Sequence, residues 1–230
     1  EVMQQTLDAV HAQRKKFNIP MFAHINHPNF GYGINTEDLK KLNGERFFEL
    51  YNGHPAVHNE GDETHLGIET MWDLINISYY NEKKPLLLGI ATDDSHKYHI
   101  KSPDHSNPGR GWVMVNSKRL DPASLIEAME AGDFYSSSGV SLKKINATDK
   151  KLSIEVDSKA DIIYEIIFIG YQEGNENMKE LKRVKGTDAE YVYEKKDRII
   201  RAKINSNVLK ENPYLEGELE QAWTQPIIVK

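Results

Sequence analysis

Apolar residues recur every three or four positions in several segments of the first 132 residues, which is the period of an amphipathic helix. The pattern predicts helices near residues 7–17, 36–42, 68–79 and 121–132. Asn35 or Thr36 can cap the second helix, while Asp121, Pro122 and Gly132 provide a cap, a first-turn proline and a terminal glycine for the last. We therefore expect four helices in this half of the chain.

Short runs that are almost entirely apolar lie between these helices, at residues 21–27, 47–51, 86–91 and 111–115. Strands that are apolar on both faces, alternating with helices, are typical of a parallel sheet covered by helices. This half of the chain is therefore predicted to be α/β.

The helical period disappears after about residue 134. Alternating or short apolar runs, separated by turn-rich stretches, predict strands near residues 152–156, 162–169, 191–193, 199–204 and 227–229. We expect two domains, an α/β part at 1–133 and a small antiparallel β module at 134–230.

The composition narrows the class of protein. The 230 residues include 29 Lys and Arg against 35 Asp and Glu, a formal net charge of −6, and no cysteine. The negative charge makes nucleic acid an unexpected partner. The missing cysteines exclude disulfides, thiolate catalysis and cysteine-bound zinc.

No run approaches the roughly 18 apolar residues of a membrane helix, so no membrane association is expected. The chain opens at Glu1 without a signal-like segment, as if a longer protein began upstream. These features leave the compartment open between cytoplasmic and periplasmic or secreted.

Imidazole and carboxylate side chains follow three of the predicted strands. His27 ends the first, Glu49, Asn52 and His54 lie at or just past the end of the second, and Asp94 and His96 end the third. The carboxyl ends of parallel strands meet on one face, and residues i and i+2 of an extended segment point the same way. Imidazole combined with carboxylate suits zinc, manganese or iron. A divalent-metal site at this face is the leading hypothesis.

Four ordered segments carry a family resemblance: His-Ile-Asn-His-Pro-Asn (24–29), Phe-Glu-Leu-Tyr-Asn-Gly-His-Pro (48–55), Gly-Ile-Ala-Thr-Asp-Asp-Ser-His (89–96) and Gly-Asp-Phe-Tyr-Ser-Ser-Ser-Gly (132–139). Together they resemble the polymerase-and-histidinol-phosphatase (PHP) superfamily of metal-dependent phosphoesterases. The resemblance covers about residues 15–140.

The resemblance implies a distorted (β/α)7 barrel, similar to a TIM barrel, with two or three divalent metal ions (Zn, Mn or Fe) at its rim. It makes His27, Asp94 and His96 the metal ligands. Glu49, Asn52 and His54 are assigned to the catalytic site, where Glu49 and Asn52 shape the cleft without being ligands. His54 and Arg110 are expected to contact an anionic substrate.

The chain also departs from the family pattern. The early His-x-His motif is absent, and about four strand candidates are present where the barrel needs about seven. A half barrel would expose a sheet edge and an apolar face. Three explanations stay open: a missing N-terminal portion, a second chain that completes the barrel, or a rebuilt fold whose site has decayed.

Two functions follow from these observations. The first is a metal-dependent phosphoesterase that hydrolyses a small phosphomonoester or phosphodiester through a metal-activated water. The alternative is a non-catalytic binding module with an incomplete metal site. A nuclease is disfavoured, because the charge is negative and no basic-aromatic stripe is visible.

Overall fold

The parallel part of the structure consists of two strands. In the computed structural model, which describes residues 1–229, β1 (Phe47–Asn52) pairs in parallel with β2 (Leu88–Thr92). The preceding extended segment joins them through one parallel bridge between Ile25 and Phe48. The predicted strand at 21–27 is therefore only a bridge beside β1.

The largest sheet has seven strands, with the order β3-β4-β11-β10-β7-β8 and β12 beside β10. All of its pairings are antiparallel. The strands are β3 (Trp112–Val115), β4 (Phe134–Ser137), β7 (Tyr164–Gln172), β8 (Lys179–Lys185), β10 (Asp197–Leu209), β11 (Leu219–Thr224) and β12 (Ile227–Ile228). This sheet crosses residue 133, because β3 lies before that position and the other strands lie after it.

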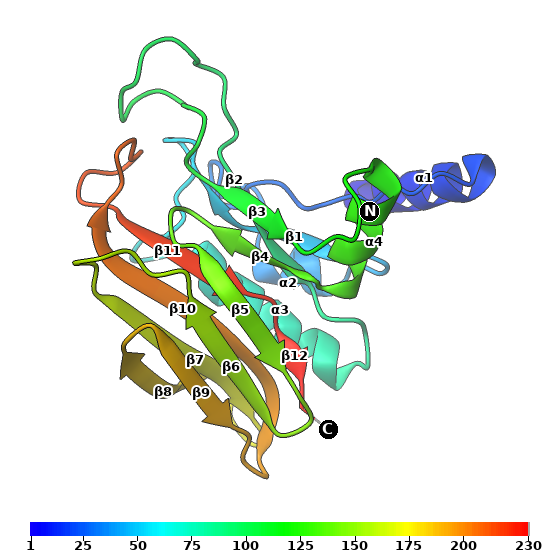
Figure 1. Cartoon of the computed structure of the whole chain (residues 1–230). Helices are drawn as coiled ribbons and strands as arrows, with labels where there is room; N and C mark the ends of the chain where they lie inside the picture. The colour runs from blue at the N-terminus through cyan, green and yellow to red at the C-terminus, as the bar shows by residue number, and fades with distance from the viewer. Residues whose placement is uncertain (230) are drawn as a thin grey trace.

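A smaller antiparallel sheet packs on the large one (Figure 1). It contains β5 (Leu142–Ala147), β6 (Lys151–Val156) and β9 (Asp188–Val192) in the order β5-β6-β9. Its buried residues, such as Leu152, Ile154 and Tyr191, share a core with Ile166, Phe168 and Ile204 of the large sheet. Alternate residues of β6 are buried, as expected for a strand with one face toward a core.

The prediction of a (β/α)7, TIM-like barrel is wrong. Strands hold 33% of the residues and helices 20%, and no such barrel is formed within residues 1–229. The run at 111–115 was expected to extend the parallel sheet, but β3 pairs antiparallel with β4. An apolar run has the same appearance in both kinds of sheet, so the direction of its partner could not be read locally.

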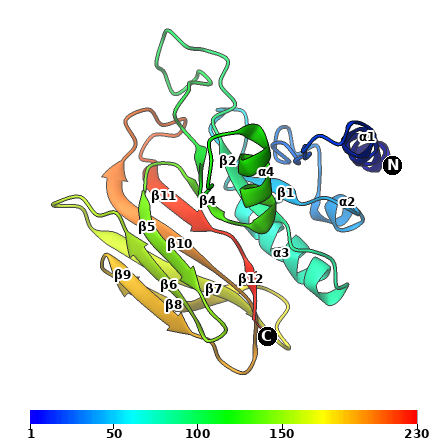
Figure 2. The same cartoon turned by 45° about the vertical axis from the view of Figure 1, so that its right-hand side comes forward.

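The helices lie with the parallel strand pair on one side of the large sheet, and the smaller sheet lies on the other side (Figure 2). They are α1 (Val2–Phe17), α2 (Thr36–Lys40), α3 (Ile68–Asn81) and α4 (Pro122–Ala131). The side chain of Asn35 caps α2, and that of Asp121 caps α4. Gly132 ends α4 in a left-handed conformation that glycine adopts without strain.

Helix α3 forms the centre of the first core. Met71, Trp72 and Ile75 are buried against the strand pair, and Trp72 Nε1 donates to the carbonyl of Leu87 over 2.9 Å. The other side of α3 meets the large sheet, where Arg201 of β10 donates two hydrogen bonds to Asp73. Helix α3 thus connects the parallel pair to the antiparallel half. None of the helices within residues 1–229 has the length and apolar character needed to cross a bilayer.

Two long loops lie at the same end of the molecule (Figure 1). One joins β2 to β3 through residues 93–111, and the other joins β10 to β11 through residues 210–218. Hydrogen bonds from Arg110 at the end of the first loop to Asn212 and Pro213 connect it to the second.

Candidate functional site

Most of the predicted site residues gather where β1 and β2 end. Asn52 and Thr92 are the last residues of the two strands and pair directly in the parallel register. The segments that follow, with His54 on one and Asp94 and His96 on the other, leave the sheet at the same edge. His27 follows the bridge segment on the other side of β1.

Glu49 is the buried anchor of this edge. The residue is 3% exposed, and its Oε2 accepts from the backbone N–H of His27 over 2.6 Å and from Asn52 Nδ2 over 3.0 Å. Oε1 accepts from the hydroxyl of Thr92 over 3.1 Å. Glu49 therefore uses its oxygens to connect the bridge segment, β1 and β2.

Asn52 connects this carboxylate to the exposed part of the site. It is fully buried, and its Nδ2 also lies 3.3 Å from Asp94 Oδ2. Its Oδ1 accepts from the backbone N–H of His54 over 2.8 Å. One amide thus sets the positions of Glu49, Asp94 and the turn that carries His54.

The backbone is strained at two of the predicted metal ligands. His27 has φ of 23° and Asp94 has φ of 48°, both in the left-handed region that residues other than glycine seldom adopt. Such strain costs on the order of 1–3 kcal/mol per residue and concentrates at functional sites. Asn18, Tyr32, Lys83 and Asp161 have the same backbone conformation elsewhere in the chain, so the strain fits a site at this edge without identifying one.

The ring of His96 presents a free lone pair. Its Nδ1 lies 2.7 Å from the carbonyl oxygen of Asp94. Since a carbonyl can only accept, Nδ1 carries the proton and Nε2 of the neutral ring is bare. A histidine oriented by a carbonyl in this way is ready to bind a metal through Nε2.

His54 has the opposite arrangement. Its Nδ1 accepts from the backbone N–H of Ala56 over 3.1 Å, so the proton of the neutral ring is on Nε2. Burial lowers the pKa of His54, which favours this neutral form. The ring centres of His54 and His96 are 5.8 Å apart and edge-on. In their neutral forms the two neighbouring rings therefore carry one N–H donor at His54 Nε2 and one lone pair at His96 Nε2.

These residues do not form a complete metal site. Within residues 1–229, no three His, Cys, Asp or Glu side chains are arranged to hold one ion. Asp94 and His96 offer an oxygen and a nitrogen, but a closed cluster needs further ligands. The two or three metal ions expected from the sequence remain a prediction.

An apolar pocket adjoins the polar edge. It has a volume of about 430 Å³ and is lined mostly by apolar side chains of α1 and of residues 23–42, with His24, His27 and Glu45 among the polar ones. Phe30 lies at this boundary, half exposed, with its ring centre 5.3 Å from that of His27 and 6.0 Å from that of His54. The Nδ1 atom of His24 is 3.8 Å from Glu49 and has no hydrogen-bond partner within residues 1–229.

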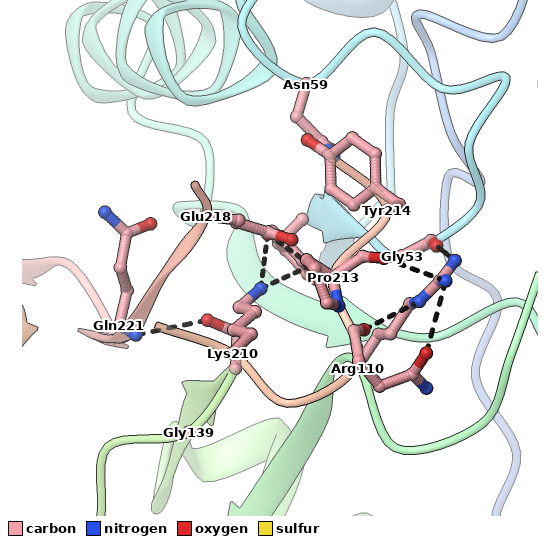
Figure 3. Close-up of polar contacts among 12 residues, drawn as sticks. Gly53, Asn59, Arg110, Gly139, Lys210, Pro213, Tyr214, Glu218 and Gln221 are labelled. Carbon is pink, nitrogen blue, oxygen red and sulfur yellow. Dashed lines mark hydrogen bonds and ion pairs between the residues drawn. The ribbon is translucent and has the colours of Figure 1, made fainter. Parts of the chain in front are cut away.

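Arg110 does not point at this space. Its guanidinium is buried and all five N–H groups are directed at protein oxygens, five of which are backbone carbonyls (Figure 3). The contact to an anionic substrate expected from the sequence therefore has no free donor to make it.

Sequence reasoning missed two residues that support the site. Thr92 was not singled out, although its place directly before the Asp-Asp pair at the end of β2 was a usable signal. Asn59 accepts from the backbone N–H of Asn52 over 3.0 Å and donates to its carbonyl over 2.8 Å. Nothing in the local sequence of Asn59 indicates this role.

Comparison with known proteins adds no identification. The chain matches no protein-family model, no curated protein and no solved structure.

Proposed function

We propose that the chain forms one side of the active site of a phosphoesterase that depends on divalent metal ions. Asp94, His96 and His27 are the candidate ligands, and the remaining ligands come from another polypeptide segment, of the same protein or of a partner chain. The ordered motifs that resemble the PHP superfamily support this proposal. The observation that carries it is the meeting of imidazoles and carboxylates at the ends of β1 and β2, held by Glu49 and Asn52.

The residues of this chain have two kinds of role in the proposed site, positioning and binding. Glu49 and Asn52 are buried and hydrogen-bonded on several sides, so they hold the geometry rather than react. The neutral ring of His54 carries its proton on Nε2, and we propose that this N–H donates to a phosphate oxygen. His96 presents a lone pair, as a ligand must. The substrate class that fits is a small phosphoester.

The test begins with metal binding. Isothermal titration of the protein with Mn²⁺ or Zn²⁺ should show binding that weakens about tenfold or more in Asp94→Asn and in His96→Ala. His99→Ala is the matched control, since His99 is an exposed histidine of the same loop. Binding that is equal in all four proteins would remove Asp94 and His96 from the site.

The second step measures turnover. The intact protein should hydrolyse p-nitrophenyl phosphate or bis(p-nitrophenyl) phosphate, lose activity on metal removal by a chelator, and recover it with Mn²⁺ or Zn²⁺. The two variants should lose most of this turnover and the control should keep it. Undiminished hydrolysis after chelation would contradict a metal-dependent mechanism.

One observation favours the second candidate, a non-catalytic binding module. The described residues contain no complete three-ligand group, and a two-metal clamp needs more ligands than Asp94 and His96 provide. The metal-to-protein ratio separates the candidates. Two or three ions per intact protein support catalysis, whereas none or one supports the module.

A further inference from the structure

The β10–β11 loop of the antiparallel half reaches the candidate site through a buried arginine. Arg110 is 1% exposed and lies at the end of the 93–111 loop that carries Asp94 and His96. Its Nε donates to the carbonyl of Asn212 over 3.0 Å, and Nη2 donates to that of Pro213 over 3.0 Å (Figure 3). Both acceptors belong to the β10–β11 loop.

The same guanidinium holds the site loop and the end of β1. Nη1 donates to the carbonyls of Gly53 over 2.9 Å and His105 over 2.6 Å, and Nη2 donates to that of Ser102 over 2.9 Å. Gly53 lies between Asn52 and His54. One side chain therefore joins three segments, two of which carry candidate site residues.

Further hydrogen bonds connect the residues just before Arg110 to the segment that contains Asp94 and His96. Asn107, also buried, donates to the carbonyls of Lys97 and Ile100, and the backbone N–H of His96 donates to Ser106 over 2.9 Å. The N–H of Gly109 donates to the carboxylate of Asp93 over 2.7 Å. The loop on either side of Asp94 is thus tied to the residues just before Arg110.

A second route runs through Tyr214 at the middle of the β10–β11 loop. Its hydroxyl accepts from Asn59 Nδ2 over 2.8 Å, and Asn59 is the residue that pairs with the backbone of Asn52. The loop therefore contacts both the Asp94 side and the Asn52 side of the site.

The ends of the β10–β11 loop are anchored next to Asn52. Lys210 and Glu218 form a buried ion pair, and Lys210 Nζ donates to the Tyr51 hydroxyl over 2.6 Å while lying 4.2 Å from the centre of its ring (Figure 3). The backbone N–H of Lys210 also donates to the Glu218 carbonyl, which closes the loop. Tyr51 is the neighbour of Asn52 in β1.

Burial of the Arg110 side chain is not explained by packing alone. The Arg110 guanidinium is buried and surrounded mainly by backbone carbonyls, and burying a charge costs free energy that an apolar side chain of similar volume would not cost. The planar guanidinium has donors in fixed directions, so it can hold several carbonyl groups in defined positions at once. We infer that Arg110 and the β10–β11 loop are positioning elements that set the geometry of Asp94, His96 and Asn52.

This inference rests on the proposed function for its purpose, but its test does not need turnover. Arg110→Met, Asn212→Ala and Tyr214→Phe each remove part of the linkage. Asn212→Ala removes only side-chain contacts to Pro108 and Arg110 in an exposed loop, so it keeps the test valid where Arg110→Met fails to fold. Arg119→Met and Tyr80→Phe are the matched controls, because the Arg119 side chain contacts Ser124 and Asp121 and the Tyr80 ring packs near Tyr171.

The first readout is amide hydrogen exchange measured by mass spectrometry. We expect exchange in residues 94–107 to accelerate at least about tenfold in the three variants, with exchange in α3 and β10 unchanged. The ring-proton NMR signals of His96, assigned with His96→Gln, should shift at the same time. Unchanged exchange and unchanged His96 signals in Asn212→Ala and Tyr214→Phe would overturn the inference.

The second readout separates positioning from general stability. Affinity for Mn²⁺ should fall in Asn212→Ala, while the midpoint of its thermal unfolding should equal the midpoints of the two control variants. A lower midpoint with unchanged affinity would show a merely structural role and reject the inference. If the unmodified protein binds no metal, the proposed function fails, and exchange together with the His96 signals still decides the positioning role.

Discussion

Glu45 is a single carboxyl whose environment couples stability to pH. It lies just before β1, where Oε1 accepts from the backbone N–H groups of Arg46 and Phe47 over 2.7 and 2.8 Å. Its other oxygen is buried and has no hydrogen-bond partner within residues 1–229. Burial raises the pKa of Glu45 to about 7, so the folded protein holds this proton more tightly than the unfolded chain does.

The sign of the effect follows from linkage. An unperturbed glutamate has a pKa of about 4.3, so stability falls as pH rises between about 4.3 and 7 and the loss is complete above 7. Glu45→Gln removes this titration, and we expect the variant to be more stable than the parent by up to about 3 kcal/mol at pH 8, with much less difference at pH 4.5. Urea unfolding at both pH values measures it. The exposed Glu127→Gln variant is the control, and a gain independent of pH would contradict the explanation.

At the scale of elements, α4 shows how local signals define a helix. The Asp121 side chain accepts from the backbone N–H of Ser124 over 2.9 Å and from its hydroxyl over 2.9 Å. Asp121→Ala should lower the free energy of unfolding by about 1 kcal/mol, while Asp121→Asn, which keeps the acceptor, should lose much less. Chemical denaturation of both variants provides the measurement. Equal losses would show that the charge, and not the cap, is what matters.

The elements that could be predicted depend on neighbours in sequence. Helix α3 needs only its own apolar spacing, and α4 needs Asp121, Pro122 and Gly132, so both were found. Strand β8 was missed because its residues are mostly polar and exposed, and it is a strand only because β7 offers it an edge. The pattern around Trp112–Val115 predicted a strand but could not show that its partner would be antiparallel.

The candidate site likewise has parts that depend on nearby residues in the sequence and parts that depend on distant ones. His27, Asp94 and His96 come directly after apolar runs, so their placement near a sheet edge could be proposed from the sequence. The surroundings of Arg110 could not be, because its acceptors include Asn212 and Pro213, about a hundred residues away. Arg110 was expected to contact an anionic substrate, and only the folded chain shows that carbonyls occupy its donors.

At the scale of the whole molecule, the free edge of β2 is closed by side chains of the antiparallel half. The backbone N–H of Gly89 donates to Gln225 Oε1 over 2.7 Å, and the Gly89 carbonyl accepts from Gln225 Nε2 over 2.9 Å and from Ser136 Oγ over 2.8 Å. The amide of Gln225 thus pairs with β2 as the backbone of another strand would. This connection, with the Arg201–Asp73 pair on α3, joins the two halves.

Removing this amide should weaken the connection between the halves. Gln225→Ala leaves the buried N–H of Gly89 without its partner, which costs about 1–3 kcal/mol. We expect a lower midpoint in urea and faster exchange of the Gly89 amide. The exposed Gln5→Ala variant is the control. A Gly89 amide that exchanges as slowly as in the parent would contradict this account of the edge.

The order of strands in the large sheet has a consequence for synthesis on the ribosome. Strands β3 and β4 pair with each other, and β11 pairs with the other edge of β4. Both β3 and β4 are translated long before β11 and Gln225. At about 5–20 residues per second, the nascent chain waits for several seconds with an unpaired β4 edge. A translation arrest before Leu219 would leave that edge exposed, and an exposed strand edge can pair with another chain, so we expect such arrested chains to aggregate more readily than the finished protein.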